Sequence, residues 1–160
     1  MAARSEYQSS STFKPMLRIP EKVQREIYDH TEASYPYECC GLMVGKMSGD
    51  TRVVHTFRKC RNLNKERARD RYELDPLDHL RTQQEFEGTE FEIIGIYHSH
   101  PDHPSRPSQT DLDAAHEGYS YVIISVQNGT VASANSWVLH GSERKFYEES
   151  LVTIKGEEKE

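Results

Sequence analysis

The segment Tyr97–Asp111, YHSHPDHPSRPSQTD, decides which fold and which chemistry to expect. It continues the apolar run Phe91–His98, FEIIGIYH, which is typical of a buried β-strand. Three prolines, Pro101, Pro104 and Pro107, then exclude regular structure from the stretch before the next helix. The pattern predicts a strand that ends in a stiff loop, which can fold the start of that helix back over the strand end.

Two histidines at the end of this strand are spaced for metal binding. Residues two apart on an extended chain point to the same side, so His98 and His100 lie roughly 6.6 Å apart at the backbone and can converge on one ion. A catalytic zinc needs three protein ligands and one open position for water. Asp111, at the start of the next helix, is well placed to be the third ligand.

Simpler interpretations of these residues remain open. A His-x-His pair at a strand end is weak evidence for a metal when it stands alone. The spacing of Ser108 and Asp111 also fits a helix capping box, in which Ser108 caps the helix, Asp111 supports its first turn, and neither does chemistry. The residues alone do not choose a general base among Glu38, Asp102 and Glu117.

The rest of the chain alternates helix and strand patterns around this segment. Helices are expected from Pro20 to before Pro36, at 76–87, and at 108–117 with Gly118 as its stop. Strands are expected at 40–45, 52–57, 72–74, 91–98, 121–126 and 131–139, with a loop at 61–71 and an edge strand at 144–154. The dipeptide Asn128-Gly129 predicts a hairpin turn. This mixture indicates an α/β (α+β) fold with a mixed sheet.

Composition narrows the class of protein. A chain of 160 residues favours one domain, expected at 16–155 between a flexible leader at 1–15 and a frayed tail at 156–160. The net charge of −6 gives no reason to expect nucleic acid or anionic membranes as partners, and no apolar run is long enough to span a bilayer. Three cysteines, two of them adjacent, make a poor disulfide framework and favour a reducing, cytoplasmic setting.

The complete pattern is more specific than its parts. Its spacing resembles the signature of the JAMM (MPN-plus) metalloproteases, carried here by His98, His100, Ser108 and Asp111. Glu38, in YPYECCGLMVG, matches the upstream glutamate of that family. The resemblance extends from about residue 19 to residue 138 and looks greatest for the compact bacterial branch, which includes the CysO-cysteine peptidase type. It implies a JAMM/MPN-type, cytidine-deaminase-like fold, with a curved mixed sheet flanked by about three helices.

The resemblance also implies a zinc-dependent hydrolysis. The ligands of the Zn2+ ion would be His98, His100 and Asp111. Glu38 would be the general base that takes a proton from the attacking water and passes it to the leaving amine. Ser108 would donate a hydrogen bond to the developing oxyanion.

The implied substrate is a small protein. JAMM enzymes generally cut after the C-terminal Gly-Gly of ubiquitin-like proteins, and the compact bacterial relatives act on small ubiquitin-like sulfur carriers. Such a tail would bind by strand addition beside the site. The segment expected to line it consists of Arg71, Tyr72, Glu73 and Leu74. Cys40 shares a strand face with Glu38 and would then line the site, although a free cysteine is more often a packed core residue.

Two other functions remain as alternatives. One is a broader deconjugase that removes ubiquitin-like proteins from lysines. The other is a non-catalytic binding module, in which zinc only staples the proline-rich loop. A structural zinc site normally closes all four positions with protein ligands. The candidates for the fourth ligand are Cys39, Cys40, His103 and His116.

Overall fold

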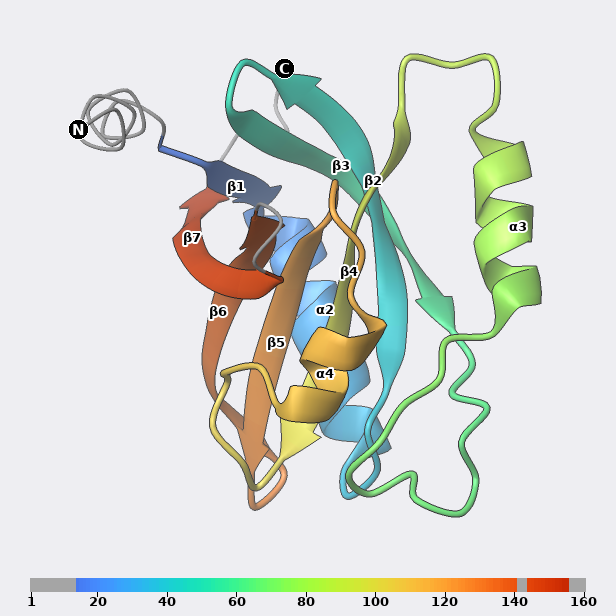
Figure 1. Ribbon diagram of the computed structural model, residues 1–160, viewed down its shortest axis with the longest axis vertical. Coiled ribbons are helices and arrows are strands. Elements are labelled where there is room, and N and C mark those ends of the chain that lie inside the picture. The colour runs from blue at the N-terminus through green and yellow to red at the C-terminus, as the bar shows by residue number, and fades with distance from the viewer. Residues whose placement is uncertain (1–13, 141–143, 156–160) are drawn as a thin grey trace.

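The computed structural model describes residues 14–140 and 144–155, which form seven strands and three helices (Figure 1). Residues 1–13 of the expected leader, and the whole expected tail at 156–160, lie outside the described residues. None of the helices in the described ranges has the length and apolar character that crossing a membrane requires.

The seven strands form one closed sheet in the order β1-β3-β2-β4-β5-β6-β7, and β7 pairs back onto β1. They are β1 (Met16–Pro20), β2 (Cys40–Ser48), β3 (Thr51–Cys60), β4 (Glu92–Pro101), β5 (Ser120–Gln127), β6 (Thr130–His140) and β7 (Lys145–Ile154). Strand β4 pairs antiparallel with β2 and parallel with β5. The expectation of a mixed sheet is therefore confirmed, and the strand that carries both histidines lies between two hydrogen-bonded neighbours.

The helices are α2 (Glu21–Ser34), α3 (Pro76–Glu85) and α4 (Gln109–Ala114). In Figure 1, α2 runs behind the sheet, the short α4 lies in front of it, and α3 stands to one side, where it packs against β3 and β4. Val23 and Ile27, four residues apart on α2, point into the core as their spacing predicts.

Two apolar clusters occupy opposite faces of the sheet. Cys39 and Tyr97 belong to the cluster on the α2 side, whereas Cys40 and Ile96 belong to the other. Neighbouring residues fall into different clusters because side chains alternate along a strand. His98 therefore shares the face of Ile96, which is the face that carries α4.

Two local signals in the sequence are confirmed. Asp75 caps α3 by accepting a hydrogen bond from the N–H of Leu77, with a proline in the first turn. Asn128 and Gly129 have φ values of 53° and 88°, as a tight hairpin requires, and they join β5 to β6.

The strand expected at 144–154 is present as β7, but the prediction that it lies at the edge of the sheet is wrong. Strand β7 pairs with β6 on one side and with β1 on the other, and β1 also pairs with β3. Strand β1 was not predicted, because the alternation of Leu17 and Ile19 is too short to distinguish from the start of a helix. Pro20 adopts extended backbone as the N-cap of α2 and lies outside its first turn.

The segment at 72–74 is not a strand. It makes a single β-bridge, between Leu74 and Asn62. The residues around it run as irregular chain over the α4 face, because the side chain of Asn62 takes hydrogen bonds that a neighbouring strand would supply.

Helix α4 is shorter than the expected 108–117, and Gly118 lies in the turn before β5 with a φ of 99°. The guanidinium of Arg144 donates hydrogen bonds to the carbonyls of Leu112, at 2.6 Å, and Ala115, at 3.3 Å. These bonds satisfy carbonyls at the end of the helix without a glycine cap. The early end thus depends on a residue about thirty positions away, which local sequence does not reveal.

Candidate metal centre and active site

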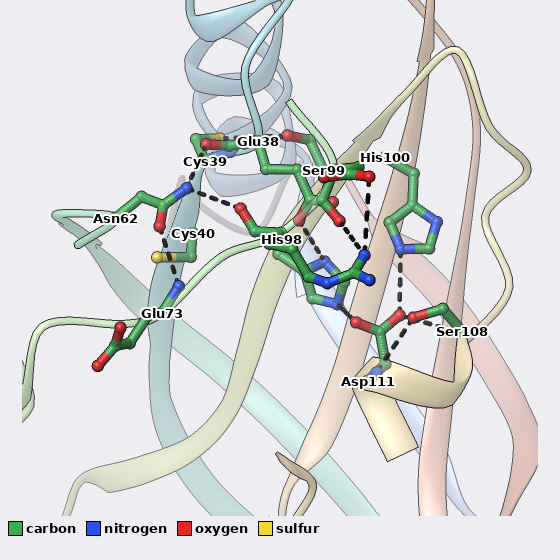
Figure 2. A network of polar contacts seen from close by, with 12 residues as sticks. Glu38, Cys39, Cys40, Asn62, Glu73, His98, Ser99, His100, Ser108 and Asp111 are labelled. Carbon is green, nitrogen blue, oxygen red and sulfur yellow. Dashed lines mark hydrogen bonds and ion pairs between the residues drawn. The ribbon is translucent and has the colours of Figure 1, made fainter. Parts of the chain in front are cut away.

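Strand β4 delivers His98 and His100 to one place. Ser99, between them, points to the opposite face and accepts a hydrogen bond from the N–H of Cys39 at 3.0 Å. Both imidazoles turn their Nε2 atoms toward the carboxylate of Asp111 (Figure 2). The distances are 3.6 Å from His98 to Oδ1 and 3.1 Å from His100 to Oδ2.

The start of α4 fixes that carboxylate. The N–H of Ser108 donates to Asp111 Oδ2 at 2.9 Å, and the N–H of Asp111 donates to Ser108 Oγ at 3.1 Å. This is a complete capping box. Ser108 and Asp111 thus form the helix cap that their spacing predicts. The cap does not exclude a ligand role for Asp111, because it holds the carboxylate against the histidines.

The three side chains suit a metal ion. One ligand atom from each of His98, His100 and Asp111 lies within 4.8 Å of the others, and no other such cluster occurs in residues 14–140 and 144–155. The Nδ1 atom of His100 lies 2.8 Å from the carbonyl oxygen of Pro104. With the proton on Nδ1, the ring donates a hydrogen bond to that carbonyl and leaves Nε2 free for a metal, which is the usual outer-shell arrangement. Two imidazoles and one carboxylate form a donor set that fits Zn2+.

The charges at the centre favour a bound cation. Burial acts to raise the pKa of Asp111, but the hydrogen bond from His100, the charge of His98 and the Ser108 N–H outweigh it and lower that pKa to about 2. Burial acts to lower the pKa of His100, but Asp111 and the Pro104 carbonyl outweigh it and raise that pKa. Asp111 is consequently ionised at neutral pH, as a metal ligand must be.

Glu38 lies beside this cluster, just before β2. The residue is only 7% exposed, and its Oε1 atom is 3.6 Å from Nδ1 of His98. Neither of these two buried atoms has a hydrogen-bond partner among the described residues. The backbone is held firmly, because the Glu38 N–H donates to the Ala68 carbonyl at 2.6 Å. A buried carboxylate oxygen without a partner is costly, so its presence beside a metal cluster indicates a functional position.

The other two carboxylates that were open as general bases lie elsewhere. Asp102 accepts hydrogen bonds from the hydroxyl of Tyr35 at 2.6 Å and from the N–H of Asn128 at 2.9 Å, so it holds a loop together. Glu117 is exposed and lines a hollow whose wall includes none of His98, His100 and Asp111. The structure brings only Glu38, of these three, to the histidines.

Two sets of contacts near the cluster, made by Asn62 and by Tyr72, were not predicted from the sequence. Asn62 donates to the carbonyls of Glu38 and Arg71, at 3.2 and 3.1 Å, and accepts from the N–H groups of Asn64 and Glu73, both at 2.9 Å. Its amide thereby ties the irregular segment before α3 to the start of β2. An isolated asparagine in a charged loop gives no warning of such a role.

The other set of contacts is made by Tyr72. Its ring stacks on the imidazole of His98, with centroids 4.3 Å apart and an angle of 23° between the planes. Tyr72 belongs to the segment expected to line the substrate, but nothing in the sequence indicates its contact with His98. The stack covers one side of His98 and so limits the directions from which a ligand can approach.

Cys40 lies in the apolar core. It is opposite His98 in the register of β2 and β4, but its side chain is fully buried among Leu42, Cys60 and Ile96, with Sγ 3.7 Å from the Arg61 carbonyl. Burial raises the pKa of its thiol well above the usual value. The Cys40 thiol lines neither of the two hollows described next. Its position is that of a packed core residue and differs from the expected site-lining role.

Two hollows flank the cluster. The first, of about 380 Å³ and here called the charged hollow, is lined by Glu38, Arg71, His100, His103, Arg106 and Ser108 with adjoining prolines and Asp70. The second, of about 670 Å³ and here called the apolar hollow, is lined chiefly by Tyr72, Leu74, Pro76, Ile96, Ala114 and Tyr119. The expected substrate-lining segment divides between them, because Arg71 faces the charged hollow and Tyr72, Glu73 and Leu74 face the apolar one.

Comparison with known families gives this geometry a context. The family of prokaryotic homologues of the JAB domain matches residues 20–140, which is most of the chain. The chain belongs to that family. The residues of the metal cluster and Glu38 all lie within the JAB-domain match.

Curated relatives of this JAB-domain chain match over part of their length. The desampylase of Haloferax volcanii is 36% identical over 91 residues, covering 56% of this chain and 63% of that protein. The tail tip assembly protein K of Escherichia phage N15 is 36% identical, covering 57% and 33%. The CysO-cysteine peptidase of Mycobacterium tuberculosis is 30% identical over 100 residues, covering 62% and 66%. The matched region spans less than two thirds of each relative.

Solved structures agree on the JAB-domain fold. The solution structure of a protein from Desulfitobacterium hafniense superposes with a TM-score of 0.77 at 26% identity, covering 88% of this chain and 94% of that one. A JAB1/MPN domain protein from Archaeoglobus fulgidus superposes with a TM-score of 0.54 at 18% identity, covering 87% and 98%. The expected JAMM/MPN-type fold is thereby confirmed.

Proposed function

We propose that this protein is a zinc-dependent peptidase that hydrolyses the bond after the C-terminal Gly-Gly of a small ubiquitin-like sulfur-carrier protein. One observation carries the proposal: His98, His100 and Asp111 converge beside the buried carboxylate of Glu38, whose Oε1 atom has no hydrogen-bond partner among the described residues, and Glu38 and His100 line the charged hollow. The free, buried thiols of all three cysteines are compatible with a reducing compartment such as the cytoplasm.

The residues that would hold the ion are His98 through Nε2, His100 through Nε2, and Asp111. When bound, Zn2+ supplies Lewis-acid chemistry, which polarises a carbonyl and makes water more acidic. The stack of Tyr72 on His98 and the carbonyl of Pro104 at His100 fix the two rings before the ion arrives. A preset donor geometry of this kind strengthens metal binding.

Glu38 moves the proton. Its Oε1 atom accepts no hydrogen bond in the described part of the chain, so it is available to accept a proton from the attacking water. As the water oxygen bonds to the carbonyl carbon, Glu38 takes that proton; as the C–N bond breaks, Glu38 gives a proton to the leaving amine. General acid–base help of this kind contributes about 10²–10⁴ in rate.

Ser108 is free to stabilise the oxyanion. Its Oγ accepts the Asp111 N–H, but its hydroxyl proton is committed to no acceptor among the described residues. The capping bond therefore holds the oxygen in place and leaves the O–H able to donate toward the charged hollow, which Ser108 lines. A preorganised donor of this kind acts on charge that develops in the transition state.

The substrate class rests on the relatives and on one strip of backbone. Relatives of this chain are named a desampylase and a CysO-cysteine peptidase. The N–H and C=O of Tyr72 make no hydrogen bond within the described residues, while the chain on either side of it is tied to Asn62. An extended tail could add beside Tyr72 as a strand and place its last glycine at the metal cluster.

Two alternatives make different demands on the site. A structural zinc staple needs a fourth protein ligand, yet within residues 14–140 and 144–155 no cysteine or further histidine joins the cluster. A broader deconjugase would cut isopeptide bonds to lysine, and the metal cluster and Glu38 would serve it equally well. The broader deconjugase and the proposed carrier peptidase would therefore use the same residues, and only the substrate that is cleaved distinguishes them.

The test uses ubiquitin extended by one cysteine after its Gly-Gly, alongside isopeptide-linked diubiquitin. We expect the zinc-loaded protein to remove the cysteine, seen by mass spectrometry, to lose this activity with a chelator, and to regain it when zinc is added. Preferential cleavage of the diubiquitin would favour the broader deconjugase. Failure to cut either substrate would favour the staple.

A further inference from the structure

The charged hollow contains cationic groups that the proposed hydrolysis does not use. Besides Glu38, His100 and Ser108, its wall includes the side chains of Arg71 and Arg106. The apolar hollow on the other side of the cluster has no arginine in its wall. The charged hollow is therefore the one of the two whose wall offers guanidinium groups to an anion.

The backbone at Arg106 is held rigidly by the contacts of its neighbour Ser105. The preceding residue, Ser105, is buried, its hydroxyl bonds to Ser133 at 2.7 Å and Asn135 at 2.5 Å, and its carbonyl accepts the indole N–H of Trp137 at 3.1 Å. These contacts anchor the loop to β6, and the prolines on either side of it stiffen the chain further. The backbone of Arg106 is thus fixed at the rim of the hollow.

The guanidinium of Arg106 itself is uncommitted. It makes no ion pair and no hydrogen bond with any residue in the described ranges, although Glu38 and Asp70 line the same hollow. An arginine that is held rigidly at its backbone beside a reaction centre, and that lacks an anionic partner, can bind an anion brought by a ligand.

Arg71 adds a second source of donors. Its Nη1 donates to the backbone carbonyl of Asp70 at 3.0 Å, while the carboxylate of Asp70 lies 3.8 Å away. That carboxylate is engaged by Arg67, with contacts of 2.5 and 3.2 Å. Because Arg67 neutralises Asp70, the remaining N–H groups of Arg71 are available to the hollow.

We infer that the charged hollow receives the leaving group and that Arg106, assisted by Arg71, binds a free α-carboxylate on it. This inference rests on the proposed function. The leaving group is then an amino acid or a short peptide whose carboxylate lies close to the new amine. The charges match such a molecule, because Glu38 faces the amine that forms and Arg106 faces the carboxylate.

This assignment separates two classes of substrate. A carrier extended by one amino acid presents a carboxylate two bonds from the scissile nitrogen, within the hollow. A lysine side chain in an isopeptide conjugate presents only methylene groups there, and leaves the arginines without an anion. Arg106 is accordingly a specificity residue that binds substrate, and it takes no part in proton transfer.

The experiment compares two labelled hexapeptides that end in Gly-Gly-Ala, one with a free C-terminal carboxylate and one with a C-terminal amide. Both are given to the zinc-loaded full chain, and kcat/KM is measured for each. We expect wild type to favour the acid. In Arg106→Gln, kcat/KM for the acid should fall by about 10- to 100-fold, the range for losing a charged hydrogen bond, while the amide changes less than about twofold.

Matched variants control for charge. Arg69→Gln removes the same charge from an exposed arginine that lies outside the charged hollow, and should leave both peptides unchanged. Arg106→Lys should recover part of the preference, because it keeps the charge and loses the bidentate geometry. Zinc content and thermal unfolding should be the same in all three variants, since Arg106 holds no other residue in place.

The outcomes separate this inference from the proposed function. If wild type cuts acid and amide equally, or if Arg106→Gln lowers both to the same extent, the carboxylate assignment is wrong while the peptidase stands. If wild type cuts neither peptide, the same acid and amide ends are compared on ubiquitin extended by one alanine after its Gly-Gly. Absence of cleavage there as well would contradict both the proposed function and the assignment that rests on it. A loss confined to the acid supports both.

Discussion

Two histidines in this protein, the buried His100 and the half-buried His30, have surroundings that push their pKa values in opposite directions. Burial, followed by the charge of Lys59, lowers the pKa of His30 to about 4. Burial also acts to lower the pKa of His100, but Asp111 and a backbone carbonyl outweigh it, so the pKa of His100 is raised. Among the described residues, the imidazole of His30 has the hydroxyl of Tyr97 as its only hydrogen-bond partner, 2.7 Å from Nδ1.

The difference shows what each kind of surrounding does to an imidazole. Burial without a carboxylate neighbour lowers the pKa and keeps the ring neutral, as in a packed structural contact, whereas a carboxylate neighbour raises the pKa and provides the second charge of a ligand site. Strand β4 builds both environments from adjacent residues. Tyr97 points to the α2 face and meets His30, while His98 points to the other face and meets Asp111 and Glu38. Because side chains alternate between the two faces along β4, the structural contact of Tyr97 and the charged centre at His98 lie on opposite faces although the two residues are neighbours in sequence.

The largest expected effect comes from removing a ligand. Asp111→Asn takes away the charge that holds a cation but keeps a side chain able to take part in the helix cap. We expect zinc content, measured by mass spectrometry of metals, to fall from about one per chain to near zero, and turnover to fall by at least about 10³-fold. His30→Asn should leave both unchanged. Equal zinc loss in the two variants would break the comparison.

The next effect is on the proton carrier. Glu38→Gln keeps the size of the side chain and removes its basicity. We expect zinc to stay bound, because Glu38 is not a member of the ligand cluster, and kcat to fall by about 10²–10⁴. Steady-state kinetics on the extended ubiquitin, with metal analysis of the same sample, checks both quantities. Turnover within about tenfold of wild type would assign the proton transfer to another group.

Ser108 has two roles that can be separated. Ser108→Ala should lower kcat by about 10²–10³ through loss of an oxyanion donor and cost about 1 kcal/mol of unfolding free energy through loss of the cap. Ser108→Asn should restore the cap, since asparagine is a good N-cap, but not the rate. Chemical denaturation and kinetics report the two effects independently. Recovery of rate in the asparagine variant would mean that Ser108 acts only through the cap.

The smallest effect concerns His30 and pH. A group whose pKa is lower in the folded state than in the unfolded state stabilises the fold above its unfolded pKa, about 6.5, and this contribution is lost as the pH falls toward 4. We expect wild type to lose on the order of 1 kcal/mol relative to His30→Asn over this range, a small value because the ring is partly exposed. Parallel pH curves for the two proteins would show that His30 is not perturbed.

The sequence was sufficient for the contacts that depend on short spacing. His98 and His100 converge because of a two-residue repeat, and the capping box of Ser108 and Asp111 can be read from its three-residue spacing. The family resemblance supplied Glu38, which the residues alone did not separate from Asp102 and Glu117.

What the sequence did not predict depends on long-range contacts. The closure of the sheet by β1 joins residues near both ends of the described chain, and the end of α4 is set by Arg144. The amide network of Asn62 and the free guanidinium of Arg106 become visible only when loops distant in sequence lie together. No local pattern encodes such contacts, because each residue in them is ordinary in its own segment.

The central claim is that zinc binds here through two imidazoles and one carboxylate. X-ray absorption spectroscopy of the zinc-loaded protein tests it directly, because sulfur and nitrogen or oxygen neighbours differ in distance and scattering. The account predicts a first shell of nitrogen and oxygen at about 2.0–2.1 Å, with the imidazole pattern of two histidines and no sulfur. A sulfur neighbour at about 2.3 Å would show that a cysteine such as Cys39 or Cys40 binds the ion, and would contradict the account.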